Sequence, residues 1–486
     1  MTQNQPSPSG SLGQRIRQAS AKQWILFALV TVVFFLFLYW HGGWCWAWIE
    51  LLWFDLYITK YIPWTWWKKI RNKTLYQVFS WIDAIVFALV AVYFINVYLM
   101  QNFVIPSSSL EKTLRVGDYL FVSKYHYGPR VPMTPLSFPL VQNTFPWGGK
   151  SYLEKPQWDY RRLTGLDTIK AMDIVVFNFP AGDTVCTLVP NPDYYQLCSM
   201  YGREAVWNNP QVFGEVVWRP VDRRENYVKR CVGLPGQTLE IRDRHIYING
   251  QAQEETPGMQ QNYWVVTDGR ELTGEQFDRV GINLDDRHRI DKRNQSYDLS
   301  WVVPMLGASD STLNPTAPAY LLPMTESMAR QAAALPNVHS VTIDSLLSKM
   351  EQQVYPDASF GWTRDNYGPV YIPRKGESIP LNEHNWKLYR RLIEVYEGNR
   401  VEVKDGRYLI NGTPCSEYTF GMNYYWMMGD NRHNSADSRY WGFVPEDHVV
   451  GKPLFVWLSV EKDQPLWKLG KHFRWSRMFR SVERLQ

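Results

Sequence analysis

Three consecutive serines, Ser107 to Ser109, lie in the segment IPSSSLEKTL, and a lysine follows three residues after the last of them. A serine hydroxyl attacks a carbonyl only when a base removes its proton. Lysine can be that base if burial among apolar groups lowers the pKa of its amine. The segment is therefore a candidate for a serine nucleophile activated by a lysine, and two lysines of the chain could serve it.

One candidate base is Lys112, which forms the spacing Ser-x-x-Lys with Ser109. Residues three apart face each other on a helix, and penicillin-binding proteins use this spacing. The chain lacks the Ser-x-Asn and Lys-Thr-Gly elements that accompany the spacing in those enzymes. The alternative for Lys112 is an exposed side chain at the rim of the site.

The other candidate base is Lys229, in the segment NYVKRCVGLPGQTLEI. The pattern predicts a strand, and alternation along it turns Tyr227 and Cys231 to the same face as the lysine. Such a partly apolar face could desolvate the amine and lower its pKa. The alternative for Lys229 is an edge-strand side chain whose amine reaches solvent.

A third polar segment, MMGDNRHNSADSRYWGFVPEDHVVGK, lies between two apolar strands, and its many polar groups predict a rigid loop. Its histidines, His433 and His448, lie near its aspartates, Asp430 and Asp437. A Ser-His-Asp triad is conceivable, but the chain has no Gly-x-Ser-x-Gly elbow. A metal site could use Asp430, Asn434 and Asp437, but their spacing fits no calcium loop.

Two apolar runs precede these motifs, at 24–40 without a charge and at 81–100 with one charge near its start. Each is about long enough to cross a hydrocarbon layer of ~30 Å as a helix. The first could instead be a cleavable signal peptide, but no small-x-small site follows it. Between the two runs, 44–63 carries Glu50 and Asp55, which are costly at mid-bilayer, and is either an interfacial helix or a third span.

The residues around the two runs predict their orientation. Many of the 23 tryptophans crowd the first 70 residues, and tryptophan favours the membrane–water interface. The positive-inside rule keeps the basic cluster between the runs cytoplasmic, which places everything after residue 100 on the outer side. The cluster consists of Lys68, Lys69, Arg71 and Lys73.

Beyond residue 100 the patterns predict mainly strands and turns. The segments 117–128 and 173–180 are rich in β-branched and aromatic residues, and 239–251 resembles 401–414 as a second β-hairpin ending in Asn-Gly. The fold class predicted is therefore mainly β, an extracytoplasmic all-β core with an inserted second domain behind N-terminal membrane helices. A net charge of +5 over 486 residues gives little reason to expect nucleic acid as a partner.

The sequence divides into four predicted parts. These are a polar N-terminal segment (1–23), a membrane anchor region (24–100), a β catalytic domain in two pieces (101–251 and 400–486) and an inserted domain of unknown role (252–399). 

Within the inserted domain a charged run (285–293) predicts a solvated surface, and a Pro/Ser/Thr-rich segment (307–319) predicts a loop. Helical patterns lie near 324–335 and 344–353. The basic and aromatic tail 467–480 is either a lipid-contacting surface or a terminal helix packed on the core.

Five cysteines form no Cys-x-x-Cys metal pattern. Cys186 and Cys198 are close enough in sequence to form a disulfide outside the cytoplasm, or they are free thiols. 

Four segments occur in order behind the predicted anchors: IPSSSLEKTLRVGDYLFVSKYHYG, DIVVFNFP, YVKRCVGLPGQTLEI and MGDNRHNSADSRYWGFVPEDHVVGK. Together they resemble the sequence boxes of bacterial type I signal peptidase, a serine protease family with a Ser/Lys dyad. The resemblance covers the anchors, residues 101–250 and about 400–460. The length of the segment 252–400 resembles the extra β domain of the larger Gram-negative members.

The resemblance implies roles for individual residues. Its Pro-Ser-x-Ser-Met pattern matches Pro106 to Leu110, which makes Ser109 the nucleophile. It makes Lys229 the general base, and it assigns the oxyanion hole to the Ser107 hydroxyl and the Ser109 backbone N–H. No metal or cofactor is implied.

Further roles fall in the last box. Ser435 matches the serine that orients the lysine amine, and Asp437 and Arg439 match an ion pair that holds the box in place. Asp430 is expected to give structural support.

Three positions depart from the family pattern. Leu110 stands where the family has Met, Lys112 stands where it has Pro, and Met172 stands where it has Gly. Leucine for methionine is a mild change of similar volume, and the loss of the proline is expected to loosen the loop. 

The resemblance implies a membrane-bound endopeptidase that removes signal peptides from exported precursors after a small-x-small motif. It implies a multi-pass protein of the bacterial cytoplasmic (inner) membrane, with the catalytic domain on the periplasmic side, contacting lipid and acting near the secretion translocon. Two other readings remain open, which are another Ser/Lys peptidase and an inactive membrane-anchored binder of exported peptides.

Overall fold

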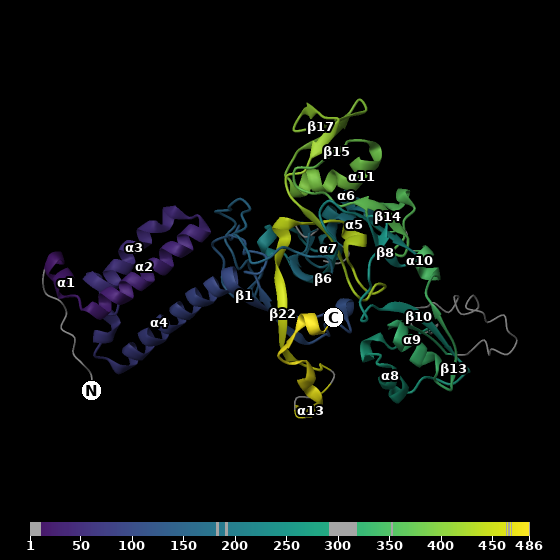
Figure 1. Ribbon diagram of the computed structural model, residues 1–486, viewed down its shortest axis with the longest axis horizontal. Helices are drawn as coiled ribbons and strands as arrows, with labels where there is room; N and C mark the ends of the chain where they lie inside the picture. Colours follow the sequence, from purple (N-terminus) through teal and green to yellow (C-terminus); the bar gives the residue numbers. More distant parts are fainter. Residues whose placement is uncertain are drawn as a thin grey trace.

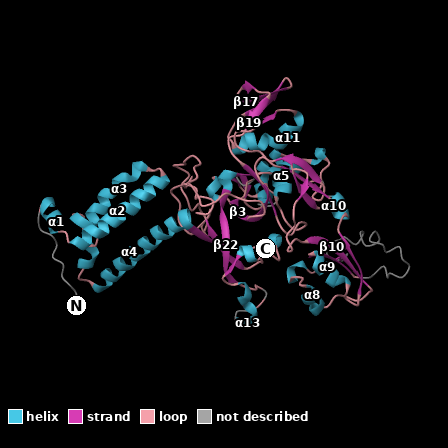
Figure 2. Cartoon of the chain, in the orientation of Figure 1, coloured by secondary structure: helices cyan, strands magenta, loops and turns pink. Residues whose placement is uncertain are grey.

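The computed structural model has a helical end and a body built mainly from strands (Figures 1 and 2). Figure 1 shows α2, α3 and α4 together at one end and the strands at the other. This arrangement confirms the predicted mainly β class behind N-terminal helices. The described residues are 11–180, 184–189, 193–290, 318–350, 353–462, 464, 467 and 469–485.

Two helices are long and apolar enough to cross a membrane, α2 (Ala21–His41) and the continuous helix Lys73–Leu99. The second consists of α4 (Lys73–Phe94) and a final wide turn (Ile95–Leu99). Both begin at capping side chains: Ser20 accepts a hydrogen bond from the Gln23 N–H, and Asn72 accepts from the next turn. The helices cover the two predicted apolar runs, although the second begins before residue 81.

The segment between these helices folds into short pieces rather than a third helix of spanning length within the described part of the chain. It contains a single turn (Trp44–Trp48), α3 (Ile49–Phe54) and a wide turn (Asp55–Thr59). The segment returns alongside α2, and the Gln23 side chain donates to the Tyr57 carbonyl at 3.2 Å. A short α1 (Leu12–Gln18) precedes α2.

An eight-stranded antiparallel sheet forms the centre of the body. Its order is β1-β2-β22-β3-β6-β20-β21, and β23 pairs with β22. The strands are β1 (Met100–Val104), β2 (Asp118–Ser123), β3 (Ile174–Asn178), β6 (Asn226–Gly233), β20 (Tyr424–Met428), β21 (Val444–Pro445), β22 (Val449–Ser459) and β23 (Arg480–Ser481). The predicted strands at 117–128 and 173–180 are therefore confirmed.

Strand β3 shows why this sheet has a core on both faces, because all five of its residues are buried. Ile174 and Val176 pack in one apolar cluster, whereas Val175 and Phe177 pack in another. Alternating side chains point to opposite faces, so a continuous apolar run is what a strand covered on both faces requires. The neighbouring strand β6, which carries Lys229, is thereby held inside the protein.

The two predicted hairpins are confirmed and are similar to each other. The first pairs β7 (Thr238–Arg242) with β8 (His245–Ile248), and the second pairs β16 (Val401–Lys404) with β17 (Arg407–Ile410). Each continues through an Asn-Gly turn with φ near 51° and 81°, the left-handed conformation that these two residue types tolerate best. The turns lead to β9 (Gln251–Ala252) and β18 (Thr413–Pro414).

A separate four-stranded sheet lies within the predicted insertion, in the order β11-β12-β10-β13, with its own apolar cluster. Its strands are β10 (Gln261–Thr267), β11 (His288–Ile290), β12 (Ala319–Met324) and β13 (Val338–Ile343), and its helices are α8 (Gly274–Val280) and α9 (Glu326–Ala333). The helices predicted near 324–335 and 344–353 are confirmed as α9 and α10 (Leu346–Met350). The predicted loop 307–319 and the end of the charged run at 291–293 lie almost wholly outside the described residues.

Later residues of the same predicted insertion join the hairpin next to the central sheet. Strand β14 (Tyr367–Tyr371) pairs with β7, and Tyr367 packs in one cluster with Leu239 and Trp426. The domain limits themselves remain a prediction. Further elements are β15 (Ser378–Pro380), β19 (Glu417–Thr419), α11 (Glu383–Arg391) and α12 (Ser438–Trp441).

A small lobe follows β3, with β4 (Thr184–Cys186), α5 (Tyr194–Tyr201), α6 (Arg203–Asn208), α7 (Pro210–Phe213) and β5 (Val216–Trp218). Cys186 and Cys198 share its apolar cluster and are free thiols. 

The C-terminal tail is not a single helix. It contains α13 (Leu469–His472), and Arg477 donates to the Asp118 carboxylate at 2.6 Å. Trp475 and Phe479 are exposed. The tail is thus tied to β2 through its arginine while it presents aromatic rings outward.

Candidate active site

The predicted nucleophile and the predicted base meet in the structure. Ser109 lies in a single 3-10 turn (Ser108–Leu110) after β1, and Lys229 lies on β6. The Lys229 Nζ donates a hydrogen bond to the Ser109 Oγ at 2.6 Å, across 120 residues of sequence. Both side chains are buried, so the contact is shielded from solvent.

Burial decides the protonation of Lys229. Desolvation lowers its pKa from 10.5 to about 8, although the carboxylates of Asp437 and Asp430 act in the opposite direction. The Tyr227 ring lies 5.7 Å from the ammonium, and Cys231 packs in the same apolar cluster as that ring, which confirms the predicted shared face. A lysine in this state has a neutral amine for an appreciable fraction of the time near neutral pH.

The polar loop after β20 holds the segment that carries Ser109. The Ser109 carbonyl accepts a hydrogen bond from the Asn431 N–H at 3.0 Å. The neighbouring Ser108 hydroxyl accepts one from the Asn434 side chain at 3.2 Å. These contacts fix the backbone next to the predicted nucleophile, as the expected rigidity of the loop requires.

A buried ion pair anchors the beginning of the same loop. Asp430 accepts two hydrogen bonds from the Arg230 guanidinium, each at 2.8 Å, and a third from the Thr113 hydroxyl at 2.7 Å. Through these hydrogen bonds, Arg230, Asp430 and Thr113 connect β6, the loop and the segment that follows Ser109. The sequence motifs assigned no role to Arg230 or Thr113. The position of Arg230 on an apolar strand was a signal that this residue has a buried partner, because a buried guanidinium requires an acceptor.

The ion pair expected between Asp437 and Arg439 is present, with distances of 2.8 and 2.9 Å. Burial opposes ionisation of Asp437, but the Arg439 charge and the Gly429 N–H outweigh it and lower the pKa of the carboxyl. Arg439 also donates to the Arg432 carbonyl at 2.6 Å. Through its contacts with Gly429 and Arg432, the pair therefore holds the end of the loop to its beginning.

Gly429 allows the loop to approach the dyad. A Cβ at this position would lie 2.2 Å from the Ser435 Oγ and 2.6 Å from the Ser109 carbonyl oxygen. Ser435 is thus next to the dyad, and its hydroxyl makes a long contact of 3.5 Å with the Ala436 carbonyl. No hydrogen bond joins Ser435 to Lys229 in the described structure, so its orienting role stays a prediction.

Ser107 lies just before the turn that carries Ser109, on extended backbone, and is exposed. Its hydroxyl has no hydrogen-bond partner among the described residues. The hydroxyl is therefore not engaged elsewhere, and its predicted part in an oxyanion hole stays a prediction.

The other candidate residues point elsewhere. The Lys112 ammonium donates to the Gly281 carbonyl at 2.8 Å rather than to Ser109. His433 lies 2.8 Å from Asp365, and His448 lies 2.6 Å from Asp447. The conceivable Ser-x-x-Lys dyad and the Ser-His-Asp triad are therefore not assembled.

The conceivable metal loop is likewise not assembled, since both of its carboxylates are bound to arginines. The described residues contain no group of three or more His, Cys, Asp or Glu side chains arranged to hold a metal ion.

Two departures from the family pattern have a backbone explanation. Lys112 has φ 75°. Proline is restricted to φ near −65°, so the turn after Ser109 takes a path that a proline could not follow. Met172 has φ 70°, the region that glycine occupies most easily, and its carbonyl accepts a hydrogen bond from Arg230 at 2.8 Å.

A cavity of about 280 Å³ opens beside Ser435. Its walls include His433, Asn434, Ser435, Gln196 and Tyr440. Neither Ser109 nor Lys229 lines it, so the cavity lies on the loop side of the site.

Comparisons with known proteins agree with this geometry. A family model described as "Signal peptidase, peptidase S26" matches residues 78–297 and 419–458, which contain Ser109, Lys229 and the polar loop. The signal peptidase I of Haemophilus influenzae is 26% identical over 418 residues, covering 86% of this chain and 79% of the relative.

Two relatives from Buchnera aphidicola, both named signal peptidase I, extend the comparison. One, from the subspecies Baizongia pistaciae, is 22% identical over 405 residues, 83% of each chain. The other, from the subspecies Schizaphis graminum, is 38% identical over 104 residues, 21% of this chain and 31% of the relative. The chain therefore belongs to the S26 family of signal peptidases, which are serine endopeptidases.

Proposed function

We propose that this chain is a membrane-anchored endopeptidase that removes N-terminal signal peptides from exported precursors through a dyad of Ser109 and Lys229. The observation that carries the proposal is the hydrogen bond of 2.6 Å between the buried Lys229 Nζ and the Ser109 Oγ. A lysine whose pKa is lowered by burial to about 8 is a suitable base for that hydroxyl.

The reaction begins with the amine of Lys229 neutral. Nζ takes the proton from the Ser109 hydroxyl as Oγ attacks the carbonyl carbon of the scissile peptide. The tetrahedral intermediate collapses when the ammonium of Lys229 returns the proton to the leaving nitrogen, which breaks the carbon–nitrogen bond. Water, deprotonated by the same amine, then attacks the ester and releases the signal peptide with a carboxylate end.

The oxyanion of the intermediate needs donors beside Ser109. We assign them to the Ser109 backbone N–H and to the Ser107 hydroxyl, whose exposed side chain has no competing bond within the described residues. The loss of one such donor typically lowers the rate by about 10²–10³-fold. Ser435, packed against Gly429, is proposed to keep the Lys229 amine directed at Oγ.

The substrate is proposed to bind in extended form along β1. This strand is the first in the order of the central sheet, and among the described strands it pairs only with β2, which leaves its other edge without a strand partner there. An extended peptide can add to such an edge, with alternate side chains in shallow pockets. Small residues at two alternating positions, a small-x-small motif, fit this arrangement.

The two long apolar helices support the proposed membrane anchoring. The wide turn at the end of the second ends at Leu99 and β1 begins at Met100, which brings Ser109 close to the membrane surface. The basic cluster at the start of that helix favours a cytoplasmic position for it. The body of the protein then lies on the periplasmic side of the bacterial inner membrane, in contact with lipid and near the translocon that delivers precursors.

The proposal is tested with the full-length protein in detergent and a purified precursor that carries a signal peptide. Mass spectrometry should identify a cut after a small-x-small motif for the wild type and no cut for Ser109→Ala or Lys229→Met. Lys112→Met is the matched control and should retain cleavage, because the Lys112 ammonium donates to the Gly281 carbonyl and does not contact Ser109. If the wild type cuts no faster than Ser109→Ala, the chain is a binder of exported peptides and the proposal fails.

A further inference from the structure

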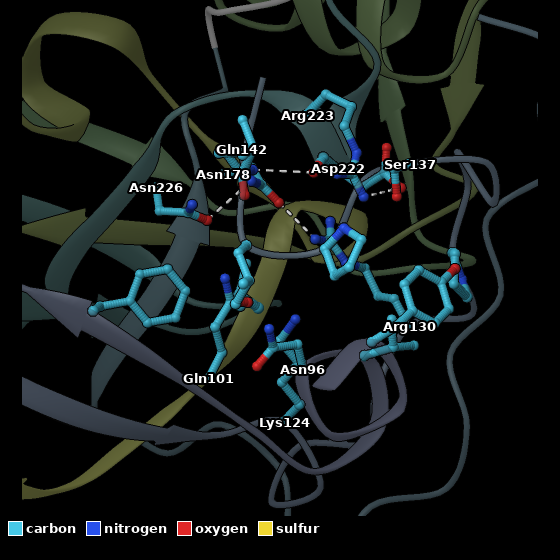
Figure 3. Close-up of a pocket in the computed structure, with 18 of the residues that line it drawn as sticks. Asn96, Gln101, Lys124, Arg130, Ser137, Gln142, Asn178, Asp222, Arg223 and Asn226 are labelled. Atoms are coloured by element: carbon cyan, nitrogen blue, oxygen red, sulfur yellow. Dashed lines mark hydrogen bonds and ion pairs between the residues drawn. The ribbon is translucent and has the colours of Figure 1, made fainter. Parts of the chain in front are cut away.

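A polar cavity of about 340 Å³ lies where the second long helix meets the body. Its walls come from the end of that helix, from β1 and from the segments after β2 and before β6 (Figure 3). Four lining residues are acidic or basic and six carry side-chain amides. They are Lys124, Arg130, Asp222 and Arg223, and Asn96, Gln101, Asn102, Gln142, Asn178 and Asn226.

The cavity has an excess of positive charge. Its carboxylate, Asp222, accepts hydrogen bonds from the N–H and hydroxyl of Thr134 at 2.9 and 2.7 Å, and it lies 3.7 Å from Arg223. Arg130 is held by the Asn178 side chain at 2.6 Å (Figure 3) and by the Asp447 carbonyl. One carboxylate thus faces three basic groups.

Two of the basic groups have unused donors. The Nε of Arg223 is buried and has no hydrogen-bond partner in the described structure. The Lys124 ammonium forms neither a hydrogen bond nor an ion pair with any described residue. Burial lowers the pKa of Lys124 to about 7, and the charges of Arg130 and Arg223 act in the same direction. An anion in the cavity would satisfy both groups and keep the lysine charged.

A second cavity shows what kind of molecule could carry the anion. It has a volume of about 820 Å³, lies between α2 and α4, and is lined mainly by apolar side chains that include Leu29, Val33 and Phe37. Tyr93 and Pro132 line both cavities, so the apolar space adjoins the polar one. A free phosphate ion would fill only the polar cavity and leave the apolar one empty. A phospholipid has a phosphate group for the polar cavity and an acyl chain for the apolar one.

We propose that these two cavities form one binding site for an anionic phospholipid, with the phosphate beside Lys124 and Arg223 and an acyl chain between α2 and α4. The inference rests on the proposed membrane anchoring and adds a lipid ligand to it. A signal peptide also joins an apolar segment to a polar one, but it brings no phosphate to the unpaired basic groups.

The test uses the delipidated full-length protein in a neutral detergent, titrated with phosphatidylglycerol, phosphatidylcholine or sodium phosphate. Bound lipid is counted by native mass spectrometry. Phosphatidylglycerol should bind in preference to phosphatidylcholine, and Lys124→Gln should weaken its binding about tenfold, because a charge-assisted contact is lost. Lys155→Gln removes an exposed lysine next to Pro156, which lines the apolar cavity, and should leave binding unchanged.

A second variant tests the apolar part without touching the charges. Leu136 lines the apolar cavity and is 50% exposed, so Leu136→Trp should be accommodated while it narrows the space. It should reduce the binding of long-chain phosphatidylglycerol. If sodium phosphate protects the protein from unfolding as well as the lipid does, or if Leu136→Trp and Lys124→Gln bind the lipid like the wild type, the lipid site is refuted.

Cleavage of a short soluble peptide by the same samples separates this inference from the proposed function. Lys124 is outside the dyad and its loop, so Lys124→Gln should cut the peptide at the wild-type rate. If the wild type cuts the peptide but does not bind phosphatidylglycerol in preference to phosphatidylcholine, the lipid site alone is overturned, whereas an inactive wild type overturns the proposed function alone. If Lys124→Gln instead loses affinity for a signal peptide while it still retains phosphatidylglycerol, the cavity binds substrate and the lipid reading is wrong.

Discussion

The Nε2 atom of His433 lies 2.8 Å from the Asp365 carboxylate, and its Nδ1 accepts the Asn262 N–H at 3.1 Å. This one imidazole therefore connects the loop beside the dyad to two separate parts of the range 252–399. Gln260 adds backbone contacts to the same loop, since its N–H donates to the Asp430 carbonyl at 2.8 Å. 

The His433 contact predicts a loss of stability in mild acid. Burial lowers the pKa of His433 below 6.5, so the folded protein binds fewer protons there than the unfolded chain does. The stabilisation that neutral His433 gives the folded state is complete above pH 6.5 and is lost as the pH falls through the lowered pKa of His433. The unfolding temperature of the wild type should fall between pH 7 and pH 5.

His433→Gln should reduce this pH dependence, because an amide can donate to Asp365 without titrating. His245→Gln is the control, since His245 is exposed and pairs with Glu255 at the surface. Equal slopes for the wild type and both variants would contradict the assignment.

The rate of peptide cleavage should rise with pH through the titration of Lys229. Its amine is the base only when neutral, and burial sets its pKa to about 8, so kcat/KM should reach half its maximum near pH 8. Stopped assays from pH 6 to pH 10 measure this profile. A rate that peaks in acid would exclude a neutral lysine as the base.

Breaking the pair of Arg230 and Asp430 should destabilise the protein strongly. Each side chain is 1% exposed, and removing one partner leaves a buried charge without its counterpart, which typically costs about 3–5 kcal/mol. Asp430→Asn should therefore lower the unfolding temperature and the cleavage rate together. Glu394→Gln breaks the exposed pair with Arg390, where about 0.5 kcal/mol or less is expected. Similar effects of the two substitutions in denaturant unfolding would contradict this prediction.

Gly429→Ala should reduce cleavage with a smaller effect on folding. The added methyl group would lie 2.2 Å from the Ser435 Oγ, so either the loop or the Ser109 carbonyl must move. A displacement of about 1 Å at a reacting group can lower the rate about 10²-fold. Gly274→Ala, where the methyl group meets nothing within 4 Å, is the matched control. Comparable kcat values for the two alanine variants would show that the close approach is unimportant.

The local patterns of the sequence predicted those features that depend on neighbouring residues. The Asn-Gly pairs identified both hairpins, because few other residues tolerate φ near 51° and 81° in succession. The alternation around Lys229 correctly gave its apolar face. The choice of Ser109 over its neighbours came from the resemblance, and the contact with Lys229 agrees with it.

Features that depend on distant partners were not predictable in the same way. Nothing near Arg230 in sequence indicates that Asp430, 200 residues later, accepts its hydrogen bonds. The pairing of β14 with β7 is also long-range, and it joins the core next to the hairpin to a segment whose pattern suggested an insertion. The segment 44–63 was ambiguous because its apolar length resembles a span, while its acidic residues favour the shorter helix observed.

Strand β1 starts at Met100, directly after the wide turn that ends at Leu99, so no flexible linker separates the long helix from the sheet. In the proposed membrane setting, this rigid junction fixes a distance from the membrane surface. It sets the height of the reactive hydroxyl above the bilayer, and one inserted residue would also reverse which side chains of β1 face inward. Precursors would then be sorted by how far their scissile bond emerges from the lipid, in addition to the residues that flank it.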